Sequence, residues 1–181
     1  MAARKSTAKQ TSVETTETTV KPKKDGRIPL DTEFPCVCNV KGGLVYISKN
    51  ALGRSAQWDE FGDVQYLDVR ELLTMRNTQK RFFTDNWLSI KDTDDGEWTG
   101  EEAYEFLRVN EHYGTFYDAD NIEKFFKLTP KQMEEQVKNM SRGMKDLLAV
   151  MAIDKIERGE IDSLKKRNDL SRILGFKMSE E

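Results

Sequence analysis

The sequence is poor in the residues that most often build covalent or metal-binding sites. It holds one histidine, two cysteines and four prolines in 181 residues. Cys36 and Cys38 are too close together to supply an ordinary disulfide framework, which favours a reducing compartment. With His112 they would give three soft ligands, one short of a structural zinc site, and no CxxC or HxxxH spacing accompanies them. The sequence therefore predicts no metal and no cofactor.

Catalytic motifs are missing as well. Gly42-Gly43 lacks the Lys-Ser/Thr that follows the glycines of a phosphate-binding loop, and no nucleophile elbow accompanies the histidine. Counted from Asp92, an EF-hand alignment places Gly96 at its fifth position and Ala103 at its twelfth, where calcium ligands are required. We therefore expect a protein that is not an enzyme, and we interpret His112 as a solvated or capping residue.

Long apolar runs are also absent, and none approaches the roughly 18 residues that a membrane-spanning helix needs. No apolar stretch follows the first lysines and arginines, as it would in a signal peptide. These features predict a protein with no membrane association, made in the cytoplasm.

Charge is distributed unevenly along the chain. Residues 1–30 hold seven basic and three acidic residues, a net charge of +4, so the remainder carries −7 of the total of −3. Residues 1–28 are rich in Thr, Lys, Ser and Glu and hold too little apolar surface to offset their ordering entropy. We predict a basic arm over residues 1–28, either disordered or extended on a partner.

Residues 29–92 have the pattern of a small β-rich domain. Two β-branched runs, residues 36–40 and 44–48, flank the Gly pair and predict a hairpin. Further runs predict a mainly antiparallel sheet of three or four strands. Asp68 and Glu71 match a capping box at the start of a helix whose apolar face begins with Val69.

Residues 93–178 predict a helical domain. Short helices are expected after Thr99 or Gly100 and after Asp118 or Asp120, and longer ones begin at N-cap residues further on. Those later N-caps are Thr129, Ser141, and Asp162 or Ser163. The predicted fold class is thus α+β: a small antiparallel sheet with one capped helix, then a C-terminal helical bundle.

Aromatic and basic residues gather in residues 58–90. Core packing is the ordinary use of such aromatics, and one or two of them are expected to be interface anchors, where Trp, Tyr and Arg are enriched. The candidate interface residues are Trp58, Phe61, Tyr66, Arg76, Arg81 and Trp87.

Three runs resemble a group of small proteins, most of them uncharacterised, encoded by tailed bacteriophages. The most specific parts are GGLVYIS, W-x-x-FG-x-VQY and ELLTMRN-x-Q-x-RFF, and the resemblance covers most of residues 28–176. It implies a phage protein associated with the virion, and it carries no catalytic or cofactor residues.

Two functions are therefore open. The first is a non-enzymatic virion protein at a capsid, neck or tail position, present in multiple copies, whose arm contacts neighbouring phage structural proteins. The alternative is a nucleic-acid-binding regulator or assembly factor that uses the basic arm and the last helix, which carries Lys165, Lys166, Arg167 and Arg172.

Overall fold

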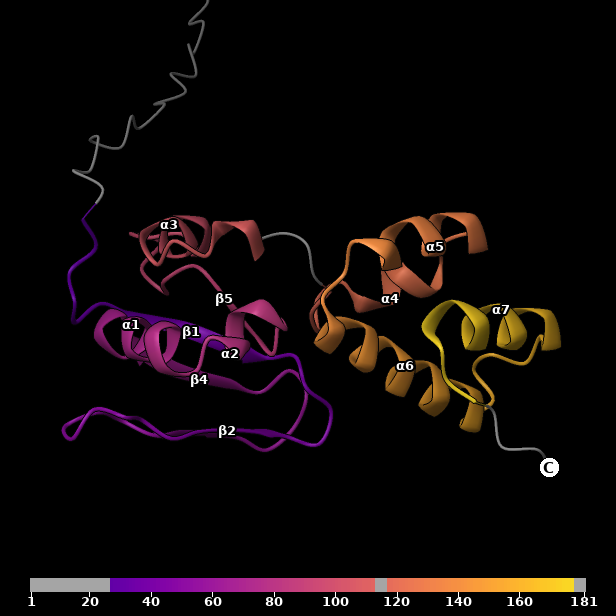
Figure 1. Ribbon diagram of the computed structural model, residues 1–181, viewed down its shortest axis with the longest axis horizontal. Helices are drawn as coiled ribbons and strands as arrows, with labels where there is room; N and C mark the ends of the chain where they lie inside the picture. Colours follow the sequence, from indigo (N-terminus) through magenta and orange to yellow (C-terminus); the bar gives the residue numbers. More distant parts are fainter. Residues whose placement is uncertain (1–26, 113–116, 178–181) are drawn as a thin grey trace, which may run out of the picture.

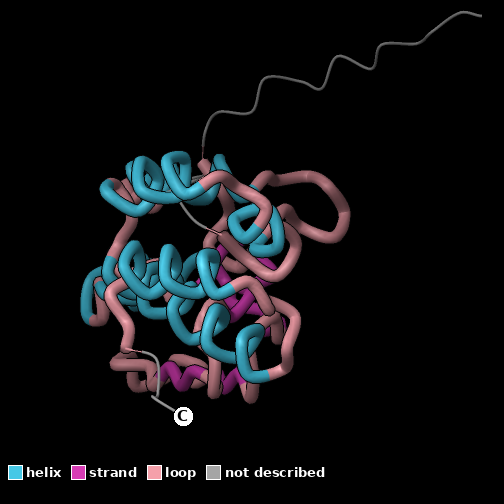
Figure 2. The backbone as a smooth tube through the Cα atoms, turned by 90° about the vertical axis from the view of Figure 1, so that its right-hand side faces the viewer, coloured by secondary structure: helices cyan, strands magenta, loops and turns pink. Residues whose placement is uncertain are grey.

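The computed structural model describes residues 27–112 and 117–177. Its sheet and helices make an α+β protein, which confirms the predicted fold class. The strands lie at one end of the long axis and helices α4 to α7 at the other (Figure 1). Seen from the helical end, these helices stand in front of the strands (Figure 2). The predicted arm falls outside the described residues except for Arg27 and Ile28, and Ile28 is buried in the β-rich half.

Within the described residues, five strands form two separate sheets. Strands β1 (Glu33–Cys38), β4 (Val64–Asp68) and β5 (Leu88–Ile90) make an antiparallel sheet in the order β4-β1-β5. Strands β2 (Leu44–Tyr46) and β3 (Ala56–Trp58) make a two-stranded antiparallel ribbon. The Trp58 indole N–H donates to the backbone oxygen of Cys36 at 2.8 Å, which attaches the ribbon to the central strand.

The predicted hairpin of residues 36–40 and 44–48 is wrong. Strand β1 is paired on both of its edges, with β4 and with β5, so it has no edge left for β2. Gly42 and Gly43 have φ of +93° and +88°, in the left-handed region that favours glycine. A Cβ on Gly43 would lie 2.8 Å from the backbone oxygens of Trp58 and Asp59. The Gly pair therefore carries the chain from the sheet to the ribbon.

Helix α1 (Val69–Thr78) begins as predicted, with Asp68 accepting from the Glu71 amide at 2.7 Å. The Glu71 side chain does not return to Asp68 as a capping box requires. It is 4 % exposed and accepts from the hydroxyls of Tyr46 at 2.6 Å and Ser48 at 2.5 Å, and from the Arg54 amide at 3.0 Å. This one carboxylate fixes the loop between β2 and β3, residues 47–55, on the start of α1.

Six further α-helices follow α1 in the described residues. They are α2 (Arg81–Thr84), α3 (Gly100–Phe106), α4 (Ile122–Phe126), α5 (Pro130–Lys138), α6 (Arg142–Glu157) and α7 (Leu164–Leu174), with a 3₁₀ turn η1 (Asn110–His112) after α3. Thr99, one of two predicted alternatives, Thr129 and Ser141 are N-cap residues as predicted, and Thr99 and Thr129 also form complete capping boxes. Neither Asp118 nor Asp120 caps α4, whose N-cap residue is Asn121.

The buried hydrophobic residues of the described chain form two separate cores. The first joins the sheet, the ribbon, α1, α2 and α3, and the second joins α4 to α7. Because Tyr104 and Leu107 of the α3 region belong to the first core, the packing divides between Val109 and Ile122, later in the chain than the predicted boundary at residue 93. Helix α7 packs on both α5 and α6, which makes the small C-terminal bundle.

The hydrogen bond from Tyr46 to Glu71 leads to a prediction about stability and its pH dependence. Burial, and then the bond to Glu71, raise the pKa of the Tyr46 phenol above its usual value near 10. The folded state therefore holds this proton more tightly than the unfolded state. The stabilisation is complete below a pH of about 10 and is lost as pH rises further.

Tyr46→Phe should lower the free energy of unfolding at neutral pH by about 1–2 kcal/mol, because buried Glu71 loses a donor. The variant should also lose less stability than the wild type between pH 10 and about 12. Urea unfolding at a series of pH values measures both effects. Tyr66→Phe is the matched control, since Tyr66 donates to Asp94 at an exposed site, and its effect at neutral pH should stay within about 0.5 kcal/mol. Equal effects of the two substitutions would contradict the assignment.

Candidate functional site

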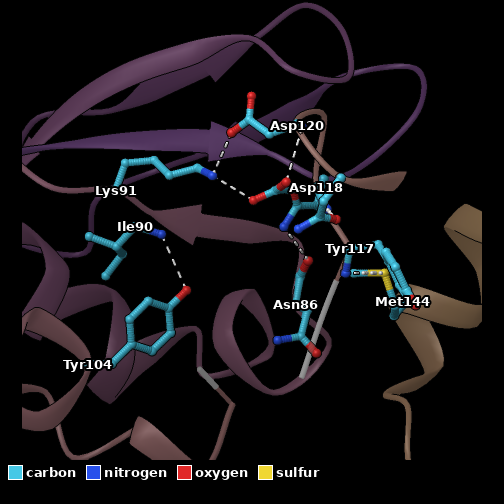
Figure 3. Close-up of polar contacts among 10 residues, drawn as sticks. Asn86, Ile90, Lys91, Tyr104, Tyr117, Asp118, Asp120 and Met144 are labelled. Atoms are coloured by element: carbon cyan, nitrogen blue, oxygen red, sulfur yellow. Dashed lines mark hydrogen bonds and ion pairs between the residues drawn. The ribbon is translucent and has the colours of Figure 1, made fainter. Parts of the chain in front are cut away.

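The two cores meet at a polar junction centred on Lys91, just after β5. The Lys91 ammonium donates to the carboxylates of Asp118 at 2.6 Å and Asp120 at 2.9 Å (Figure 3). Asp118 is 4 % exposed, and it also accepts from the Asp120 amide. Burial disfavours the ammonium, but the two carboxylates outweigh burial and raise the pKa of Lys91. This ion pair thus connects the sheet to the turn that leads into α4.

A second contact brings the start of α6 against the turn between α2 and β5. The Ser141 hydroxyl donates to the backbone oxygen of Asp85 at 3.1 Å. A Cβ on Gly143 would lie 2.2 Å from the Asp85 oxygen and 2.9 Å from the Trp87 indole. Only glycine allows the helix to come this close.

Beside the contact at Gly143 and Trp87 lies a cleft of about 330 Å³, which we call the junction cleft. Its lining comes from both halves of the chain: Asn39, Val40, Lys41, Leu44, Trp87, Gly143, Asp146, Leu147 and Val150. Most of these side chains are apolar. Lys41 is paired with Asp154 of α6 at 2.8 Å, and this bond lowers the pKa of Asp154. The cleft exists only while the two halves hold this arrangement.

Three of the predicted interface residues lie at or near this junction. Trp87 lines the cleft, and the Arg81 guanidinium lies 4.7 Å from the centre of its ring while pairing with Asp85 at 2.8 Å. Phe61 packs on the second core from the loop before β4. An arginine stacked on a half-buried tryptophan is typical of protein-binding surfaces.

The other three predicted interface residues lie elsewhere. Trp58 is 1 % exposed and belongs to the first core, so it has no surface to offer a partner. Arg76 donates to the backbone oxygen of Leu107 at 3.0 Å, which ties α1 to the end of α3. Tyr66 is 45 % exposed on β4, away from the cleft, and donates to Asp94 at 2.9 Å.

Sequence reasoning missed Leu44, Gly143, Leu147 and Val150 as residues of one site. A signal was present for Gly143, because a glycine inside an apolar helix costs about 1 kcal/mol and usually has a packing reason. The others read as ordinary core positions, and only the fold brings Leu44 next to α6.

The two cysteine thiols of the described residues are buried. Cys36 and Cys38 are both 0 % exposed free thiols, and burial raises the pKa of Cys36 to about 12. Such a thiol is not a nucleophile near neutral pH. Across residues 27–112 and 117–177, no three His, Cys, Asp or Glu side chains come together so that they could hold a metal ion.

Comparisons with known proteins give no relative. No protein-family model matches the chain, and no curated protein or solved structure matches it. Among the helices that the structure describes, none is long and apolar enough to cross a bilayer.

Removing the Lys91 ammonium should destabilise the junction. Lys91→Met leaves Asp118 buried without its cation, and we expect a loss of about 1–3 kcal/mol, less than for a fully buried pair because Lys91 is partly exposed. Adding Asp118→Asn should recover most of this loss, because the second change removes the uncompensated charge. Urea unfolding measures each variant.

Arg158→Met serves as the control, since it removes an exposed partner of Asp154 and should change stability by less than about 0.5 kcal/mol. A double variant as unstable as Lys91→Met would show that the charge on Asp118 is not the cause.

Gly143→Ala should separate α6 from the first half. The added Cβ has no room beside Asp85, so the free energy of unfolding should fall by about 1–3 kcal/mol although alanine favours helices. Acrylamide quenching of tryptophan fluorescence should rise, because Trp87 is the tryptophan at the junction, whereas Trp58 and Trp98 are buried.

The control is Arg142→Ala, one residue earlier, where the side chain is 84 % exposed. It should leave both quenching and stability unchanged. Unaltered quenching in Gly143→Ala would contradict the close approach.

Proposed function

We propose that the chain is a non-enzymatic bacteriophage structural protein, made in the host cytoplasm and built into the virion at a capsid, neck or tail position. It acts there by binding other phage structural proteins in multiple copies, and its N-terminal arm contacts neighbouring subunits. The resemblance of GGLVYIS and the neighbouring runs to phage proteins supports this proposal.

The observation that carries the proposal is the junction cleft. An apolar hollow lined by Trp87, Leu147 and Val150, beside an arginine stacked on the tryptophan, suits the binding of a protein side chain. The buried carboxylate Glu71 is committed to the fold, because it accepts hydrogen bonds from Tyr46, Ser48 and Arg54. An apolar cleft at the surface and a buried carboxylate used for structure favour a binding protein over a catalyst.

The alternative, a nucleic-acid-binding regulator, finds less support in α7. Arg172 contacts Glu134 and Asp169, Arg167 donates to the backbone oxygen of Ile161, and Lys166 donates to that of Phe126. Cations engaged in this way are less available to neutralise phosphates. A DNA-binding role would therefore depend mainly on the basic arm.

Quantitative mass spectrometry of purified phage particles tests the proposal. We expect the chain in particles at a copy number that is a multiple of a ring or capsid symmetry, because structural subunits occupy equivalent positions. The major capsid protein in the same sample provides the internal standard.

Absence from particles together with abundance in infected cells would contradict the proposal. The nucleic-acid-binding regulator would then be the favoured function, and DNA binding with a steep salt dependence in a gel shift would support it.

A further inference from the structure

The loop between β2 and β3 presents apolar side chains to solvent. Leu52 is 96 % exposed and Ile47 is 60 % exposed, and we call these two residues the apolar tip. The loop is held by its neighbours: Glu71 accepts from the Ser48 hydroxyl and the Arg54 backbone amide, and the Gln79 side-chain amide donates to the Ile47 backbone oxygen at 2.7 Å. A loop fixed before binding loses little conformational entropy on binding.

The apolar tip and the junction cleft lie at opposite ends of the ribbon. Leu44, at the start of β2, lines the cleft, whereas residues 47–55 form the loop at the far end (Figure 1). The tip of one chain therefore cannot fill the cleft of the same chain. It can reach the cleft of another copy.

Shape and charge favour that pairing. The cleft, of about 330 Å³, offers Val40, Leu44, Leu147 and Val150 to an apolar side chain. Of the two charged residues in its lining, Lys41 is neutralised by Asp154, while Asp146 is 70 % exposed and 3.8 Å from Arg142. The tip loop carries Lys49, an exposed cation whose charge is opposite to that of Asp146.

We propose that the chain self-associates head to tail, with the apolar tip of one copy inserted into the junction cleft of the next and Lys49 beside Asp146. Such a heterologous contact closes into a ring or continues as a filament, according to the rotation between neighbours. The contact area is small, so a single contact is weak and concentration-dependent, and repetition around a ring strengthens it.

Sedimentation velocity of the purified full-length chain over a range of concentrations tests this inference. The weight-average sedimentation coefficient of the wild type should rise with concentration. Leu52→Asp and Val150→Asp should each weaken self-association roughly tenfold to a hundredfold, because each replaces apolar contact with a charge. Leu164→Asp is the matched control, since Leu164 is 72 % exposed at the start of α7, away from both surfaces, and it should associate like the wild type.

Mixing the two defective variants gives the sharpest test. Leu52→Asp keeps an intact cleft and Val150→Asp keeps an intact tip, so an equimolar mixture should form one good contact and stop at a heterodimer.

Lys49→Glu should weaken association, and adding Asp146→Lys should restore part of it. Thermal unfolding of each variant confirms folding, because all four positions are exposed.

A wild type that stays monomeric at every concentration would overturn the inference. So would Leu52→Asp that associates normally, or a mixture that forms no heterodimer. Sedimentation uses the purified chain alone, so a failure of self-association would not contradict the virion proposal. Absence of the chain from phage particles would contradict the virion proposal, and sedimentation would still test self-association.

Discussion

The ammonium of Lys91, placed between two carboxylates from the other half of the chain, is the interaction on which the arrangement depends. Apart from Phe61, which comes from the first half and packs on the second core, the members of each hydrophobic core come from its own half, and the described contacts between the halves are mostly polar. Polar contacts are directional, so they fix an orientation where apolar packing alone would permit sliding. The junction cleft is a product of that orientation, because its walls belong to different cores.

The buried carboxylates Glu71 and Asp118 hold parts of the fold in position. Glu71 would be costly to bury alone, but three donors satisfy it and draw a surface loop onto a helix start. Asp118 plays the same part for the turn before α4. Glu71 thereby places the apolar tip, one of the surfaces proposed for binding, whereas Asp118 fixes how the two halves meet.

Local sequence signals predicted the starts of several helices correctly. The pairing of strands depends on residues far apart along the chain, and this pairing was not predicted. Thr99, Thr129 and Ser141 cap their helices because capping depends on a few neighbouring residues. The hairpin prediction failed because the strands that pair with β1 lie far from it along the chain, and no local pattern identifies them. Trp58 was placed among interface candidates since an aromatic residue has the same composition signal in a core and at a surface.

The site was predicted only in part. Arg81 and Trp87 were named as interface candidates, yet their stacking and their place beside α6 depend on the fold. Lys91 and Asp118 are separated by 27 positions, and the sequence holds 29 basic and 32 acidic residues, so no sequence pattern singles out this pair.

Because both thiols are buried, cysteine reagents should not react with the folded chain. Its two cysteines are Cys36 and Cys38, and both are fully covered. A cysteine introduced on any exposed side chain would be the one group that a maleimide dye or gold particle labels. The native sequence is thus a ready background for attaching a single marker at a chosen point.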